Sequence, residues 1–129
     1  MARSFVSHAG VDVVVVDGAL LVLYALTLQR LSDSDERGAE LRELLSMGEH
    51  WIGMLGIELS CIDRACAEQL CAVVHDLAHG DVSTDELEKA RDRWFSHVRE
   101  WSEEGIPEEL IQAAVVGPLQ ELCERFLAA

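Results

Sequence analysis

Apolar residues occur along the whole chain, and their longest run covers residues 13–31, VVVVDGALLVLYALTLQRL. All positions in this run are apolar except Asp17, Gly18, Thr27, Gln29 and Arg30. At helical spacing the apolar positions surround the helix, so it must be enclosed by protein or by lipid. A membrane span needs about 20 apolar residues with few charges. Because charges interrupt and close this run, we predict a central helix inside a protein core and no membrane span.

Two further helices are predicted from apolar residues that recur at three- and four-residue intervals. The second helix has the apolar stripe Leu41, Leu44, Leu45, Trp51, Ile52, Leu55 and Leu59. The third covers about residues 62–79 and has the stripe Ile62, Cys66, Leu70, Val73 and Leu77. Gly80 follows it, as is typical of a helix C-terminus. Gly56 lies inside the second stripe, which indicates a bend or a close approach of the first helix.

Two more helices follow after residue 82. Ser83 and Glu86 have the spacing of a capping box, which begins a fourth helix. Its apolar face comprises Leu87, Trp94, Val98 and Trp101. A fifth helix is predicted from Pro107 to Leu127, with a kink at Pro118, which removes one backbone hydrogen bond.

These elements define the predicted fold class. Residues 11–16 are the one β-like run, and no partner strand is evident in the sequence. Residues 1–10 show no strong pattern, and we expect them to be loosely ordered. We therefore predict an all-α protein, a compact bundle of about five helices around a central hydrophobic helix, in one domain over residues 1–129. An alternative is a homodimer in which two copies share the first helix.

The charge balance restricts the partners. The chain has 24 acids and 10 Lys plus Arg, for a formal net charge of −14. Duplex binding needs clustered cations and anionic membranes repel such a chain, so we expect neither nucleic-acid nor membrane binding. The charge favours a protein partner with a basic surface, and the competing interpretation is simple solubility. The acid-rich corner at residues 100–109 predicts the contact residues Glu100, Glu103, Glu104, Glu108 and Glu109.

The four cysteines indicate a reducing compartment. No secretory signal is evident before them, so we expect a cytoplasmic protein with free thiols. Cys61, Cys66 and Cys71 are spaced by five residues, so on a helix each points about 140° away from the previous one. They therefore do not converge on one metal ion.

One segment has the character of a metal site. His75 and His79 are four residues apart, so both imidazoles project from one helix face, and Cys71 extends that face. Two imidazoles at this spacing can chelate a borderline divalent metal. We expect this face to lie opposite the apolar stripe, in solvent. The alternative is a solvated helix face without a metal, and a third hypothesis is a variant of the H-E-x-x-H zincin helix in which Asp76 replaces Glu.

The segment His75-Asp76-Leu77-Ala78-His79-Gly80-Asp81 also resembles the signature of HD-domain metal-dependent phosphohydrolases. By this resemblance His75 and Asp76 are metal ligands. His50 is then the upstream histidine and Asp92 the later aspartate, with Asp85 as its substitute. The resemblance implies that divalent metals activate water for attack on a phosphate ester such as a nucleotide.

Two functions are therefore predicted. The first is a small acidic cytoplasmic protein that acts by binding another protein, as a regulator, an inhibitor or an immunity-type binder. It needs no cofactor. The alternative is a small phosphohydrolase of the HD type, which needs a divalent metal.

Overall fold

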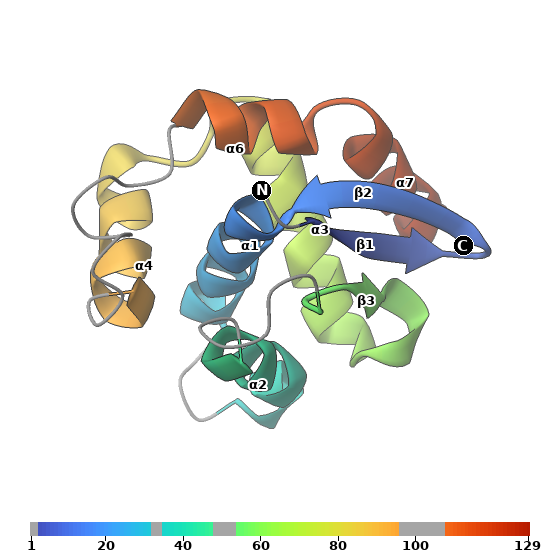
Figure 1. Cartoon of the computed structure of the whole chain (residues 1–129), viewed down its shortest axis with the longest axis horizontal. Coiled ribbons are helices and arrows are strands. Elements are labelled where there is room, and N and C mark those ends of the chain that lie inside the picture. Colours follow the sequence, from blue (N-terminus) through green and yellow to red (C-terminus); the bar gives the residue numbers. More distant parts are fainter. Residues whose placement is uncertain (1–2, 32–34, 48–53, 96–107) are drawn as a thin grey trace.

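The computed structural model describes residues 3–31, 35–47, 54–95 and 108–129. Within these ranges it combines helices with a three-stranded mixed sheet, so the all-α prediction is wrong (Figure 1). The strands are β1 (Arg3–His8), β2 (Val11–Val16) and β3 (Ile57–Glu58). The α-helices are α1 (Asp17–Arg30), α2 (Ala39–Met47), α3 (Arg64–Ala78), α4 (Thr84–Phe95), α6 (Glu108–Val115) and α7 (Pro118–Ala128). Two short 3-10 helices, η1 (Glu36–Gly38) and η2 (Leu59–Cys61), precede α2 and α3.

The β-hairpin of β1 and β2 is a feature that the sequence did not predict. The strands pair antiparallel from Arg3 opposite Val16 to His8 opposite Val11. The two-residue turn between them has positive φ at both Ala9 (51°) and Gly10 (81°). This backbone is the one that two-residue hairpins favour, because its twist matches that of the strands. The segment expected to be loosely ordered thus supplies the partner strand for the valine run.

The third strand lies within the segment predicted as the second half of the second helix. β3 pairs parallel to β1, with Val6 opposite Ile57, and the strand order is β2-β1-β3. A Cβ atom at Gly56 would collide with the backbone of Phe5, so the missing side chain allows the two strands to approach. The glycine therefore accommodates β1, and the prediction that the first helix approaches it is wrong. The helix itself, α2, is described over Ala39–Met47.

The predicted central helix is present but shorter, because residues 13–16 belong to β2. α1 begins at Asp17, and every residue from Ala19 to Leu28 is buried. The helices α2, α3, α4 and α6 and the strand β2 all contact it, and Figure 1 shows it between α4 and the sheet. The expectation of a helix enclosed on all sides by protein is thus confirmed. No helix in the described residues is long and apolar enough to cross a membrane.

Helix α3 confirms the third predicted helix. The Asp63 side chain caps its N-terminus by accepting hydrogen bonds from the backbone N–H groups of Ala65 (2.9 Å) and Cys66 (3.3 Å). At the other end Gly80 adopts a positive φ of 71°, as predicted for the residue that follows a helix. The cap of the fourth helix is also present, since the backbone N–H of Glu86 donates to Ser83 Oγ (3.1 Å).

The predicted fifth helix is divided into α6 and α7. Gly117 has φ 94° and precedes Pro118, the first residue of α7. A positive φ cannot continue a right-handed helix, and proline cannot donate a backbone hydrogen bond there. The predicted kink is therefore a complete break.

Buried polar groups connect the sheet to α1. Ser4 Oγ donates to Asp17 Oδ1 (2.6 Å) and accepts from the backbone N–H of Leu55 (3.0 Å). The Leu55 carbonyl accepts from the hydroxyl of Tyr24. These bonds join β1, α1 and the segment before β3. Burial raises the pKa of the Tyr24 hydroxyl far above its usual value, and the negative charge of Asp17 raises it further.

Candidate functional site

The histidine pair lies at the C-terminal end of α3. His75 and His79 are both exposed, as predicted, and the side chain of His75 keeps 58% of its surface accessible. Their rings stack with centroids 4.2 Å apart and planes at 28°. Helical periodicity explains this arrangement, since residues four apart are neighbours on a helix surface.

Each histidine has an oxygen acceptor beside its Nδ1 atom. His79 Nδ1 lies 2.8 Å from the backbone carbonyl oxygen of His75. His75 Nδ1 lies 3.4 Å from Asp76 Oδ1, a longer and weaker contact. Neither contact involves Nε2, so both Nε2 atoms remain available for other partners.

Asp76 belongs to an ion-pair cluster that joins three helices. Arg30, the last residue of α1, donates from Nη1 to Asp76 Oδ2 (2.7 Å) and from Nε to Glu86 Oε1 of α4 (2.9 Å). Gln29 also donates to the backbone carbonyl of Glu86 (3.1 Å). Burial favours a raised pKa for Asp76, but hydrogen bonds from Arg30 and His75 and their positive charges outweigh it and lower the pKa. The side chain of Asp76 is therefore a structural partner of Arg30.

Cys71 does not extend the histidine face. It is buried in the core, where its thiol is hydrogen-bonded with that of Cys123 on α7. This bond, followed by burial, raises the pKa of Cys123 far above its usual value. The side chain of Cys71 therefore belongs to the core and not to the exposed histidine face.

The remaining predicted metal ligands do not complete a site in the described ranges. Asp92 and Asp85 are exposed residues of α4, and His50 lies outside the described residues. Glu68 forms an exposed ion pair with Arg64, four residues before it (3.0 Å). Within the part of the chain that the structure describes, no group of three or more His, Cys, Asp and Glu residues is placed to hold a metal ion.

The predicted acidic contact residues are only partly placed. Glu100, Glu103 and Glu104 lie outside the described residues. For Glu108 and Glu109 only the backbone is described, as the first described residues of α6. Their backbone positions alone do not test the predicted contact with a partner.

A second candidate site, which the sequence did not predict, is the outer face of the sheet. Phe5 of β1 and Val14 of β2 form a cross-strand pair, and they are 53% and 50% exposed. Side chains alternate between the two faces of a strand. Ser4, Val6 and Val15 accordingly point to the core and are buried, which places Phe5 and Val14 on the opposite face.

Polar and apolar residues surround this pair. Arg3 precedes Phe5 on the same face and is exposed. Ser7 donates a hydrogen bond to the side chain of Asp12 (2.5 Å) on the neighbouring strand. On the β3 side Gly56 presents no side chain, and Met54, two residues before it, is 61% exposed. We use the name outer sheet face for Arg3, Phe5, Ser7, Asp12, Val14, Met54, Gly56 and Glu58.

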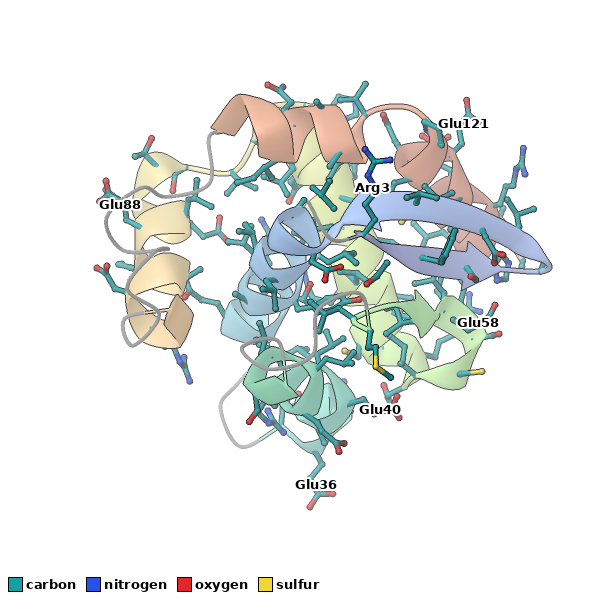
Figure 2. The ribbon with its side chains drawn as sticks, in the orientation of Figure 1. Arg3, Glu36, Glu40, Glu58, Glu88 and Glu121 are labelled. Carbon is teal, nitrogen blue, oxygen red and sulfur yellow. The ribbon has the colours of Figure 1, made fainter. Side chains whose placement is uncertain are left out.

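The acidic charge does not select one face of the molecule. Figure 2 shows Glu36 and Glu40 at one end, Glu88 on α4 at another side, and Glu58 and Glu121 towards the sheet and α7. Exposed acids in the described ranges are Asp12, Glu36, Glu40, Glu43, Asp63, Glu68, Asp81, Asp85, Glu88, Asp92, Glu121 and Glu124. Exposed cations there are fewer: Arg3, Arg37, Arg64, Lys89, Arg93 and Arg125.

Comparison of the chain with protein-family models, curated proteins and solved structures found no match.

Proposed function

We propose that this protein acts by binding another protein, and that the outer sheet face is its contact surface. The partner has an apolar patch surrounded by basic residues. The observation that carries the proposal is the cross-strand pair of Phe5 and Val14, each about half exposed, on a face opposite the core. Exposed apolar surface with a polar rim is typical of protein interaction sites.

The composition of the face supports this assignment. Phe5 offers a large aromatic surface, and Met54 an adaptable apolar side chain. Aromatic residues contribute much of the binding free energy at protein interfaces. The charged residues Arg3 and Asp12 lie two positions from Phe5 and Val14 on their strands, where they can select the partner by charge.

A basic partner follows from the net charge of −14. Such a chain attracts a basic protein over several ångströms and so accelerates their encounter. The same charge repels a second copy of this chain, which disfavours the homodimer as the occupant of the face. The four free cysteines fit the reducing cytoplasm, and we propose that compartment for the interaction.

The phosphohydrolase alternative has less support. It needs Asp76 as a metal ligand, but one carboxylate oxygen of Asp76 pairs with Arg30 and the other lies near His75. A ligand role for Asp76 would leave Arg30 with Glu86 alone and loosen the junction of α1, α3 and α4.

The proposal is tested by comparing three baits in affinity capture from cells of the source organism. The baits are the wild type, the Phe5→Ser/Val14→Ser variant and the Val116→Ser/Leu127→Ser variant. The last removes two exposed apolar side chains of similar exposure (48% and 47%) outside the sheet, and so controls for general hydrophobic adhesion. Circular dichroism and thermal unfolding verify that all three baits are folded.

We expect a basic protein that the wild type and the Val116→Ser/Leu127→Ser variant retain and the Phe5→Ser/Val14→Ser variant loses. With purified components, the Phe5→Ser/Val14→Ser variant should raise Kd by about 30-fold or more, which corresponds to the loss of at least 2 kcal/mol expected for an interface centre. Equal retention by all three baits would contradict the proposal. A partner that is the chain itself would reassign the face to a homodimer.

A further inference from the structure

We propose that His75 and His79 bind one borderline divalent metal ion through their two Nε2 atoms, with Cu²⁺ preferred over Ni²⁺ and Zn²⁺. This site is independent of the proposed protein interaction. It differs from the HD-type site, because Asp76 orients a ligand and is not a ligand itself.

The spacing of the two residues supports chelation. His75 lies in the last turn of α3, and His79 is the residue that directly follows the helix. Both are exposed, and their rings lie 4.2 Å apart. Both side chains are exposed, so small rotations of the rings can direct the two nitrogens toward one ion. Because both ligands come from one helix, a second imidazole is already in place when the first binds.

The hydrogen bonds favour the required tautomer. A backbone carbonyl oxygen can only accept, so the contact of 2.8 Å between His79 Nδ1 and the His75 carbonyl requires the proton on Nδ1. Asp76 Oδ1 favours the same tautomer in His75. The unprotonated Nε2 atom then carries the lone pair that a metal binds. Metal-ligating histidines commonly donate their second ring nitrogen to a carbonyl or carboxylate in this manner.

Arg30 holds the orienting carboxylate in place. Its hydrogen bond to Asp76 Oδ2 (2.7 Å) leaves Oδ1 beside His75. Neutral imidazoles suit Cu²⁺, Ni²⁺ and Zn²⁺, whereas Mg²⁺ prefers oxygen ligands. Water completes the coordination, so the ion is exchangeable and the site is open to a further ligand.

The experiment is calorimetric titration of untagged protein with Cu²⁺ and with Ni²⁺, and with Mg²⁺ as the negative control. The variants are His75→Ala, His79→Ala and, as the matched control, Glu68→Ala on the exposed surface of the same helix. Thermal unfolding with and without Ni²⁺ provides a second readout, because a metal that binds only the folded state raises Tm.

We expect one Cu²⁺ per wild-type chain, with unchanged binding in Glu68→Ala. Each histidine variant should weaken binding by at least about tenfold, the smallest loss usual even for a residue that only orients a ligand. The rise in Tm with Ni²⁺ should disappear in both. The proposal is overturned if either histidine variant keeps the wild-type affinity, or if the wild type binds Cu²⁺ no more tightly than Mg²⁺.

Discussion

Phe5 lies directly opposite Val14 in the antiparallel pair of β1 and β2, and both side chains point away from the core. On the other side of β1, Gly56 contacts the backbone of Phe5 and presents no side chain. Phe5 therefore meets the segment before β3 through its backbone and the proposed interface through its side chain, so every variant at this position needs a stability measurement.

Gly56→Ala should strongly destabilise the protein. The added Cβ would meet the Phe5 carbonyl, a rigid backbone group, so β3 would have to move away from β1. We expect a loss of about 3 kcal/mol in the free energy of unfolding, which is at the upper end of the overpacking range. Urea unfolding measures the loss. Met54→Ala, an exposed change two residues earlier, is the control and should be nearly neutral; equal stability of both variants would contradict the assigned strand contact.

Tyr24→Phe should cost about 1–3 kcal/mol, because it leaves the buried carbonyl of Leu55 without the hydroxyl that it accepts from. The matched control is Thr27→Val, which removes another buried hydroxyl from α1. Thr27 Oγ1 donates to the carbonyl of Leu23 in its own helix (2.7 Å), so its loss affects no second segment. A larger loss for Thr27→Val than for Tyr24→Phe in thermal or urea unfolding would be evidence against this role of Tyr24.

Arg30→Met should destabilise the junction of α1, α3 and α4. The substitution leaves Asp76 and Glu86 without the cation that they share, in a partly buried position. We expect a loss of about 1.5–3 kcal/mol, the range for hydrogen bonds to charged groups. Arg37→Met removes an exposed arginine that pairs with Asp35 close by in sequence, and its effect should be smaller. Unfolding of the two variants at the same urea concentration would contradict this stabilising role of Arg30.

The ion pair should also make stability depend on pH. The folded-state pKa of Asp76 lies below its ordinary value of 3.8 because of Arg30 and His75, despite the opposing effect of burial. This contribution is fully present above the unfolded-state pKa and is lost as the pH falls through the folded-state pKa. Wild-type stability should therefore decrease as the pH falls below about 5. Asp76→Asn should lose less over this interval in urea unfolding, and an identical decrease would contradict the prediction.

The helical core could be predicted from the sequence because its signals are local. The apolar run of α1 has no polar face, and α3 carries both its cap Asp63 and its terminal Gly80 within one segment. The hairpin lacked such a signal. Its turn is Ala9-Gly10, and alanine is not a residue that usually adopts a positive φ. The sequence therefore offers no evident partner strand for the valine run, and its apolar character alone predicts a helix.

The two candidate sites also differ in how far local sequence signals predict them. The stacking of His75 on His79 follows from their spacing, and their exposure was predicted. The partner of Asp76 could not be predicted, because Arg30 lies 46 residues away and meets it only through the packing of α1 on α3. The outer sheet face depends on three segments that come together in the sheet, so no single stretch of sequence indicates it.

The most direct test of the proposed interface is hydrogen–deuterium exchange of the wild type with and without its captured partner. We expect the partner to slow amide exchange in residues 3–16 and 54–58, which form the hairpin and β3, and to leave α4 unchanged. Protection confined to α4 or α6, with none in the hairpin, would contradict the account and place the contact on the acidic helices.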